Sequence, residues 1–188
     1  MNTQIVLPES RAVINSPRLF CIGRNYAAHA AEMNSPMPEQ PMVFLKPSTA
    51  IVRNGGEVVL PSQSQEIHHE VEMVTIIGKT GKNIDVNQAE MYIEGYAVGL
   101  DMTARDIQAK AKKKGHPWSV AKGFDTFAPL GDFVPKSEVK DPQNLEIKLL
   151  INGAVRQKGS TRNMHFNVLD LVAYCSTIFT LYNAMHTQ

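Results

Sequence analysis

The sequence has little of what would place it in a specialised class of protein. It has only two cysteines, Cys21 and Cys175, which are far apart in the sequence and fit no metal-binding spacing. We therefore predict two reduced thiols in the core of a cytoplasmic protein, with a disulfide between them as the alternative. The chain has no run of about 18 apolar residues, so we expect no membrane span. Its first residues, Met1–Ile5, lack a basic region followed by an apolar one, so we expect no signal peptide.

The sequence also lacks a large excess of positive or negative charge. The formal net charge is +1, which argues against a general polyanion binder. The one basic cluster comprises Lys110, Lys112, Lys113 and Lys114. It fits either a nucleic-acid patch or cations at a helix C-terminus, where the helix dipole favours them. The second interpretation is preferred, because no aromatic residues interleave with the lysines.

The remaining composition is that of an ordinary globular chain. Of its 188 residues, 43% are hydrophobic and 20% are charged, enough for one domain covering residues 1–188. Residues 1–17 form an irregular or edge extension, and the tail 182–188 has no usable periodicity. Hydrophobic patterning predicts strands over 19–23, 41–47, 57–61, 66–78 and 95–100, and a hairpin of 145–151 with 154–157 around Asn152-Gly153.

Four helices are predicted from composition and capping residues. The first covers residues 24–33, and the second is a short helix capped by Asp85 or Asn87 and running through Ile93. The third covers 104–114, capped by Thr103 or Asp101 and stopped by Gly115. The fourth covers 168–179 and is capped by Asn167; its predicted core residues are Leu169, Val172, Ala173 and Ile178.

A pair of glutamates is the most informative feature of the sequence. Glu70 and Glu72 lie two apart in a predicted strand and therefore share one face. Two neighbouring carboxylates repel each other, and a hard divalent cation between them would remove the repulsion. The alternative is two glutamates on a solvated strand face. Asp101, at the end of the strand 95–100, adds a third carboxylate, and three carboxylates suit Mg²⁺ or Mn²⁺, or else Ca²⁺, better than zinc.

A histidine and a glutamate share one face of the first predicted helix. Tyr26, His29 and Glu32 are spaced three apart. Glu32 can orient the imidazole of His29 and stabilise its charge, and His29 can then take a proton from water. The alternative is an ordinary packed or surface histidine.

With these motifs together, the sequence closely resembles the fumarylacetoacetate hydrolase family, and within it the short acylpyruvate hydrolase and oxaloacetate decarboxylase members. The matching motifs follow family order and lie at residues 23–32, 44–48, 69–72, 99–108 and 121–125. The resemblance implies an α+β fold with a large mixed β-sheet, rolled on itself, and flanking helices. It also implies a homodimer.

The resemblance assigns a role to each matching residue. It implies that Glu70, Glu72 and Asp101 bind the metal, and that His29, Glu32 and Lys122 are catalytic, with His29 and Glu32 on a mobile lid helix. It places Arg24, Lys46, Arg105 and Gln108 against the substrate, a small 2-oxo acid, with no nucleic-acid or membrane partner.

The implied chemistry is hydrolysis of the carbon–carbon bond of a 3-acylpyruvate such as acetylpyruvate or fumarylpyruvate. Hydroxide generated at His29 would attack the distal carbonyl, and the departing pyruvate enolate would be stabilised by the metal and Lys122. Oxaloacetate could lose CO₂ at the same site, because its departure also leaves pyruvate enolate.

The tail departs from the family pattern. Family members usually continue beyond the position of Leu181 with a turn, a strand and a Thr-Gly-Thr-Pro loop, whereas this chain has Tyr182–Gln188. We therefore expect a sheet without its last strands, with an exposed edge and apolar surface. A second hypothesis follows, in which the protein is a catalytically impaired relative that binds metal or acts as an assembly partner.

Overall fold

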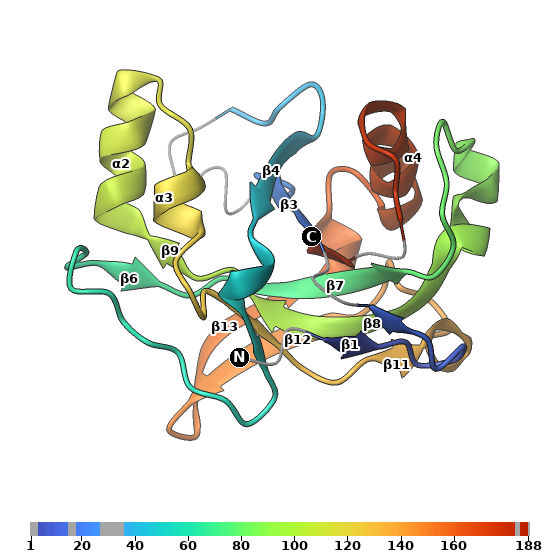
Figure 1. Ribbon diagram of the computed structural model, residues 1–188, viewed down its shortest axis with the longest axis horizontal. Coiled ribbons are helices and arrows are strands. Elements are labelled where there is room, and N and C mark those ends of the chain that lie inside the picture. The colour runs from blue at the N-terminus through green and yellow to red at the C-terminus, as the bar shows by residue number, and fades with distance from the viewer. Residues whose placement is uncertain (1–3, 15–17, 27–35, 183–184, 188) are drawn as a thin grey trace.

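The computed structural model describes residues 4–14, 18–26, 36–182 and 185–187 (Figure 1). Its centre is an eight-stranded mixed sheet. Seven of its strands follow the order β4 (Met42–Lys46), β3 (Leu19–Gly23), β14 (Met185–Thr187), β7 (Val71–Ile77), β8 (Ile93–Leu100), β10 (Ala128–Leu130) and β5 (Ile51–Arg53). The eighth strand, β11 (Val134–Pro135), pairs with β8. The β14–β3 and β10–β5 pairs are parallel, and the other pairs are antiparallel.

Three two-stranded pairs lie outside this sheet. They are β1 (Ile5–Val6) with β2 (Val13–Ile14), β6 (Ile67–His68) with β9 (Thr103–Ala104), and β12 (Glu146–Ile151) with β13 (Ala154–Ser160). The β12–β13 hairpin was predicted from its Asn-Gly turn. Asn152 and Gly153 have φ angles of 52° and 79°, as a type I′ turn requires.

Among the described residues, the α-helices are α2 (Arg105–Lys114), α3 (Ser119–Lys122) and α4 (Val168–Ile178). The 3₁₀ helices of the same part of the chain are η1 (Ser48–Ala50), η2 (Val86–Tyr92), η3 (Lys136–Glu138) and η4 (Thr161–Asn163). In Figure 1, α2 and α3 stand over one end of strands β7 and β8, and α4 stands over the other end. None of the helices that the structure describes is long and apolar enough to cross a membrane.

Three apolar clusters form the core of the described residues, and the alternation of β3 supplies two of them. Phe20 and Ile22 pack in the cluster that includes α4, whereas Leu19 and Cys21 pack in a second cluster with β1 and β5. Successive strand residues point to opposite faces, so a strand that is covered on both faces is apolar throughout. Cys21 and Cys175 are both buried and form no disulfide, as predicted, and burial raises the pKa of Cys175 to about 12.

The capping residues had mixed outcomes. Asn167 caps α4 with a full capping box, and Gly115 ends α2 in the left-handed conformation at φ 67°. Asp85 caps η2, which is a 3₁₀ helix and ends before Ile93. The predicted caps of α2 were wrong, because Ala104 precedes that helix and no side chain caps it.

Three other local predictions were wrong. Residues 57–61 form no strand; Val59 and Leu60 are 62% and 65% exposed, and the Val59 amide bonds the Thr126 hydroxyl instead of a neighbouring strand. No helix begins at Arg24, whose φ is +59°. The rest of that predicted helix, including His29 and Glu32, lies outside the described residues. Ile178, predicted in the core, is 50% exposed.

The tail contributes to the central sheet, although no element was predicted there. Strand β14 lies between β3 and β7, with Met185 opposite Leu19 on one side and Ile76 on the other. Just before it, Leu181 is fully buried and its backbone pairs with Gly81. The carboxylate-bearing strand β7 is therefore joined to the N-terminal strand β3 through the tail.

Candidate metal centre and substrate cavity

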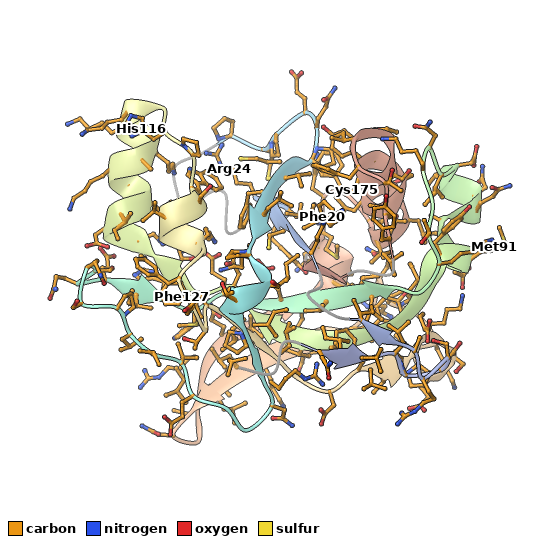
Figure 2. The ribbon with its side chains drawn as sticks, viewed as in Figure 1. Phe20, Arg24, Met91, His116, Phe127 and Cys175 are labelled. Carbon is orange, nitrogen blue, oxygen red and sulfur yellow. The ribbon has the colours of Figure 1, made fainter. Side chains whose placement is uncertain are left out.

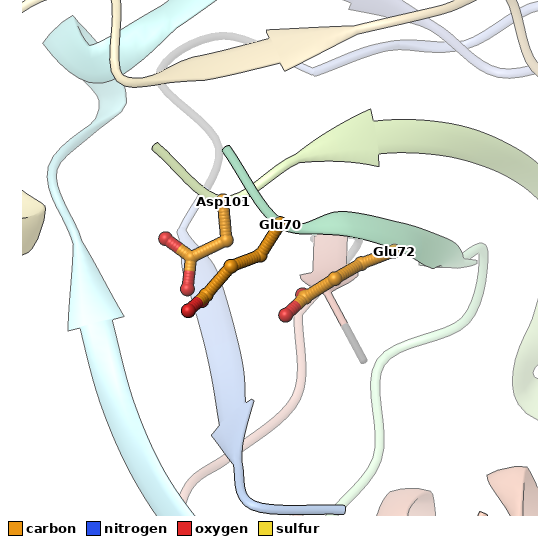
Figure 3. Close-up of side chains that lie close together, drawn as sticks. All are labelled: Glu70, Glu72 and Asp101. Atoms are coloured by element: carbon orange, nitrogen blue, oxygen red, sulfur yellow. The ribbon is translucent and has the colours of Figure 1, made fainter. Parts of the chain in front are cut away.

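Three carboxylates converge where strands β7 and β8 meet. Glu70 immediately precedes β7, Glu72 lies within it, and Asp101 follows β8. The antiparallel register places Val71 opposite Leu100, and the Asp101 amide donates to the Glu70 carbonyl at 2.9 Å. One oxygen from each carboxylate lies within 4.8 Å of the others (Figure 3). The sequence suggested this set of carboxylates as one alternative, and the family resemblance implied it.

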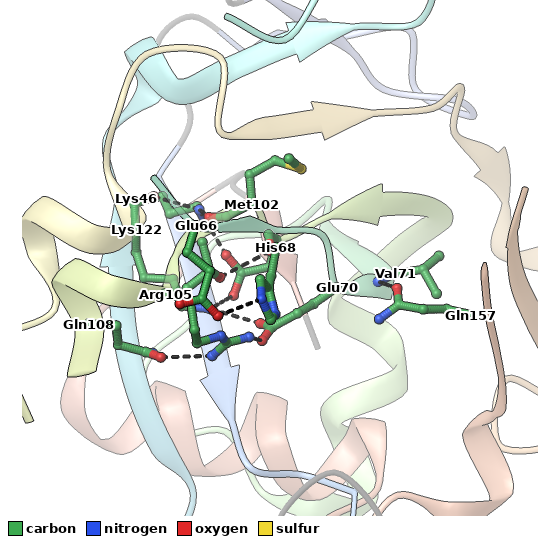
Figure 4. A network of polar contacts seen from close by, with 12 residues as sticks. Lys46, Glu66, His68, Glu70, Val71, Met102, Arg105, Gln108, Lys122 and Gln157 are labelled. Carbon is green, nitrogen blue, oxygen red and sulfur yellow. Dashed lines mark hydrogen bonds and ion pairs between the residues drawn. The ribbon is translucent and has the colours of Figure 1, made fainter. Parts of the chain in front are cut away.

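Cations already balance two of the three carboxylates. Lys122 Nζ is 2.8 Å from Glu70 Oε2 and also pairs with Asp101. Lys46 Nζ is 2.8 Å from Asp101 Oδ1, and Arg105 pairs with Glu70 (Figure 4). Burial alone would lower the pKa of Lys122, but the charges of Asp101 and Glu70 outweigh it and raise that pKa. Lys122 is thus held as a cation at the centre of the cluster.

Glu72 lacks such a partner within the described residues. Its Oε2 atom is shielded from solvent and makes no hydrogen bond. Burial raises the pKa of Glu72 well above its usual value; Asp101 and Glu70 raise it further, and Lys122 and Lys46 oppose them. A buried acceptor without a donor is costly, and an oxygen-preferring cation would satisfy it. The three carboxylates therefore fit a hard divalent ion.

A cavity of about 760 Å³ opens onto the carboxylates. Arg24 and Tyr26 line one part of it, Arg105 and Gln108 another, and the β13 strand with Gln157 a third. The Gln157 side chain accepts a hydrogen bond from the Val71 amide at 2.9 Å, midway between Glu70 and Glu72 (Figure 4). Sequence analysis missed this wall, because the hairpin's turn signal says nothing about where it packs.

Tyr26 is a further residue that sequence analysis did not assign to the site. Its hydroxyl is buried without a hydrogen-bond partner among the described residues. Burial and the nearby charge of Glu72 raise the pKa of Tyr26 to about 12, so it remains a neutral donor beside that carboxylate. Its spacing from His29 and Glu32 and its place in the family motif at residues 23–32 were the signals in the sequence.

The other predicted substrate residues differ in position. Arg24, Arg105, Gln108 and Lys122 line the cavity, whereas Lys46 does not. Lys46 lies behind Asp101, and its ammonium donates to the backbone carbonyls of Met102 and Phe127 at 3.0 and 2.9 Å. It also donates to the carbonyl of Lys122, the last residue of α3. These contacts suit Lys46 to positioning Asp101 and α3. The predicted positions of His29 and Glu32 in the site fall outside the described residues.

The chain matches the family model for the fumarylacetoacetate (FAA) hydrolase C-terminal domain over residues 18–184. It belongs to the fumarylacetoacetate hydrolase family. The curated proteins similar to it include a mitochondrial oxaloacetate tautomerase from Arabidopsis thaliana, 48% identical over 88% of this chain and 74% of that protein. A mitochondrial oxaloacetate decarboxylase from Dictyostelium discoideum is 45% identical over 87% of this chain and 76% of that one.

Solved structures of this family share the fold. Fumarylpyruvate hydrolase from Pseudomonas aeruginosa, in complex with Mn²⁺ and pyruvate, has a TM-score of 0.90 and 38% identity, covering 98% of this chain and 82% of that one. A 5-carboxymethyl-2-hydroxymuconate delta-isomerase from Mycobacterium smegmatis has a TM-score of 0.79 and 36% identity, covering 92% and 66%. The family and the α+β fold implied by the resemblance are thereby confirmed.

Proposed function

We propose that this member of the fumarylacetoacetate hydrolase family is a divalent-metal-dependent enzyme that acts on 2-oxo acids through a pyruvate enolate or related enol. The observation that carries the proposal is the convergence of Glu70, Glu72 and Asp101 with Lys122 on one cavity. Relatives named for oxaloacetate tautomerisation and decarboxylation support it, because both reactions pass through an enol or enolate of a 2-oxo acid.

Glu70, Glu72 and Asp101 are the proposed metal ligands. Mg²⁺ and Mn²⁺ both suit three carboxylates, and the Mn²⁺ in the Pseudomonas aeruginosa complex supports the latter. When bound, the ion would supply Lewis-acid stabilisation of the negative charge that develops on the 2-oxo oxygen. Lys46 and Lys122 would hold the ligands in place through their ion pairs.

Lys122 is the proposed catalytic cation. Its ammonium lies in the cavity between Glu70 and Asp101 and remains protonated, so it can donate a hydrogen bond to an enolate oxygen. Arg105 and Gln108 extend the polar wall away from the carboxylates, with Arg105 donating to Gln108 Oε1 at 2.7 Å. They would contact the end of the substrate remote from the 2-oxo group.

Oxaloacetate is the first candidate substrate. In tautomerisation its C3 loses a proton and its 2-oxo oxygen gains one. In decarboxylation the C3–C4 bond breaks, its electron pair forms pyruvate enolate, CO₂ leaves, and C3 then takes up a proton. Both reactions require the anionic oxygen to be stabilised, which the buried Lys122 supports.

Hydrolysis of a 3-acylpyruvate is the second candidate, favoured by the similarity to fumarylpyruvate hydrolase. Here hydroxide adds to the distal carbonyl carbon, and the carbon–carbon bond breaks to give a carboxylic acid and pyruvate enolate. This reaction needs a base for water, and His29 with Glu32 remains the prediction for it. In a third possibility, the protein is the catalytically impaired relative that binds metal or assembles without turnover.

One set of measurements separates these candidates. Metal-free protein is supplied with Mn²⁺ or Mg²⁺, and loss of the oxaloacetate enol, pyruvate formation and loss of acetylpyruvate are followed. We expect metal-dependent turnover that Glu72→Ala abolishes and Glu138→Ala, at an exposed position, preserves. Unchanged activity in Glu72→Ala would refute the ligand assignment. A thermal shift with Mn²⁺ and oxalate but no turnover of any substrate would indicate the impaired relative.

Assembly and location are also proposed. We propose a homodimer, supported by the exposed apolar side chains of the β12–β13 hairpin. We propose a cytoplasmic location, supported by the two buried cysteines that form no disulfide and so suit a reducing compartment.

A further inference from the structure

We propose that Arg24 and Lys112, together with Arg105, form an anion subsite that selects dianionic 2-oxo acids by binding the carboxylate remote from Glu70, Glu72 and Asp101. The inference rests on the proposed function and specifies its substrate class. It assigns a role to Lys112, which sequence analysis interpreted only as a cation at the end of a helix.

The charge of the cavity wall is the first observation. Its described lining contains six basic side chains, Arg24, Arg105, Lys112, Lys122, Arg156 and Lys158, and only three acidic ones, Glu70, Glu72 and Asp101. A divalent ion on the carboxylates would increase this positive excess. A cleft lined by one sign of charge concentrates ligands of the opposite sign, so the cavity favours anions.

Three of these basic side chains already have acidic partners. Lys122 pairs with Glu70 and Asp101, Arg105 with Glu70, and Lys158 with Glu146 at 2.8 Å. Within the described residues, Arg24, Lys112 and Arg156 pair with no carboxylate. Arg24 and Lys112 are therefore available to a ligand. Arg156 is also without a carboxylate partner, but it belongs to the wall of the cavity that the β12–β13 hairpin forms.

Arg24 and Lys112 come from distant parts of the chain and line the same cavity. Arg24 follows β3 in a left-handed conformation, and Asn25 anchors this segment to the backbone of Phe166. Lys112 lies in the last turn of α2, on the side of the sheet where Figure 2 places Arg24. Lys112 is an exposed residue of the cavity rim, and its slight desolvation, then the charges of Arg24 and Arg105, lower its pKa. Like charges that face one cavity repel, and a bound anion would relieve the repulsion.

Arg105 connects these cations to the carboxylate cluster. One of its terminal nitrogens pairs with Glu70 and the other donates to Gln108 (Figure 4). Its Nε is buried and makes no hydrogen bond, so it can still donate to a ligand. A substrate whose 2-oxo group lies at the carboxylates would extend past Arg105 towards Arg24 and Lys112. Its second carboxylate would then meet them, whereas an alkyl acyl group would leave both cations unpaired.

The test compares a dianionic with a monoanionic substrate. KM and kcat are measured for oxaloacetate and for acetylpyruvate, at constant ionic strength, in wild type, Arg24→Met, Lys112→Met and Lys113→Met. Lys113 is the matched control, because it carries the same charge on the same turn of α2 but does not line the cavity. Loss of one charge-assisted hydrogen bond predicts a rise of about tenfold in KM for oxaloacetate in Lys112→Met. KM for acetylpyruvate should change less than about twofold, and Lys113→Met should resemble wild type.

A binding readout keeps the subsite testable if turnover fails. Affinities of the Mn²⁺-loaded protein for 2-oxoglutarate and 2-oxobutyrate, unreactive dianionic and monoanionic 2-oxo acids, are measured by calorimetry. Absence of turnover in wild type would contradict the proposed function, while a preference for the dianion that falls in Lys112→Met would still support the subsite. The subsite would be overturned if Lys112→Met changed the affinities for both ligands equally or changed neither. It would also be overturned if Lys113→Met changed them in the same way.

Discussion

At the residue scale, the buried Glu72 oxygen couples stability to metal and pH. Because its pKa is raised in the metal-free fold, Glu72 contributes stability below its unfolded pKa of about 4.3, and that contribution is lost as pH rises through the folded pKa. Glutamine does not titrate. We therefore expect metal-free Glu72→Gln to melt above wild type at neutral pH, with the difference shrinking towards pH 4.

Thermal melts between pH 4 and 8, in chelator and in Mn²⁺, check this prediction. Mn²⁺ should stabilise wild type and have little effect on Glu72→Gln, since the variant loses a ligand. Glu138→Gln, at an exposed position, is the control and should follow wild type in both conditions. A metal-free Glu72→Gln that melts below wild type would show that the carboxylate is not destabilising.

Gln157 is expected to position the two glutamates. Its side chain satisfies the Val71 amide between them, so Gln157→Ala frees the backbone that carries both carboxylates. We expect Mn²⁺ affinity, measured by calorimetry without substrate, to fall by about tenfold, the lower end for groups that orient metal ligands. Gln88→Ala, at an exposed position, is the matched control. An unaltered Mn²⁺ affinity in Gln157→Ala would show that Gln157 does not position the two glutamates.

Site residues could be predicted from the sequence where the chemistry of the side chain limits the groups that can lie beside it. Glu70, Glu72 and Asp101 could be grouped because neighbouring carboxylates favour a shared cation and the family motifs contain all three. Lys46, Tyr26 and Gln157 could not be placed in the same way. Gln157 meets Val71 across 86 residues of sequence, and such a contact leaves no local pattern.

At the element scale, Asn25 joins the end of β3 to the segment that enters α4. Its side chain accepts from the Phe166 amide at 2.8 Å and donates to the Phe166 carbonyl at 3.0 Å, and Asn25 is 3% exposed. Asn25→Ala would leave both backbone groups unpaired, each costing about 1–3 kcal/mol. We expect the free energy of unfolding, from denaturant titration, to fall by about 2 kcal/mol or more.

Asn54→Ala is the control for this prediction. Asn54 is exposed, and its side chain bonds only the exposed Asp132 at 3.2 Å, so its replacement should change the free energy of unfolding by less than about 0.5 kcal/mol. An equal fall in the free energy of unfolding in the two variants would mean that the buried Asn25 contacts stabilise the fold no more than an exposed hydrogen bond does.

Elements were predictable where local chemistry determines them. Asn167 and Asn152-Gly153 act within a few residues, and both behave as expected. Residues 57–61 have strand-like composition, but a strand needs a neighbour, and the Val59 amide bonds Thr126 instead. The alanine-rich pattern after Arg24 suggested a helix from that residue, yet tertiary hydrogen bonds of Asn25 override the local propensity at its start.

At the scale of the whole molecule, the predicted homodimer can be checked directly. The β12–β13 hairpin exposes Leu150, Ile151 and Val155 at 48%, 37% and 56%. Light scattering coupled to size exclusion should give twice the chain mass of 20.8 kDa. Leu150→Lys with Val155→Lys should shift the mass towards the monomer, because charge at an apolar interface is unfavourable. Val59→Lys, 62% exposed elsewhere, should not. A monomeric wild type would contradict the prediction.

The order of the strands in the sheet is the part of the fold that sequence patterns predict least well. Periodicity identifies strands, but β10–β5 and β14–β3 pair across long stretches of sequence. The fold class was predicted from the resemblance to the family, because composition and periodicity do not show how separate motifs are arranged in one sheet.

The position of β14 also bears on how the protein forms during synthesis. Strands β3 and β7 emerge early from the ribosome, yet both border β14, whose residues 185–187 emerge more than a hundred residues after β7. Until then each strand has an open hydrogen-bonding edge, and such edges recruit other chains. Strands β3 and β7 must therefore avoid pairing with neighbouring chains until residues 185–187 have been synthesised.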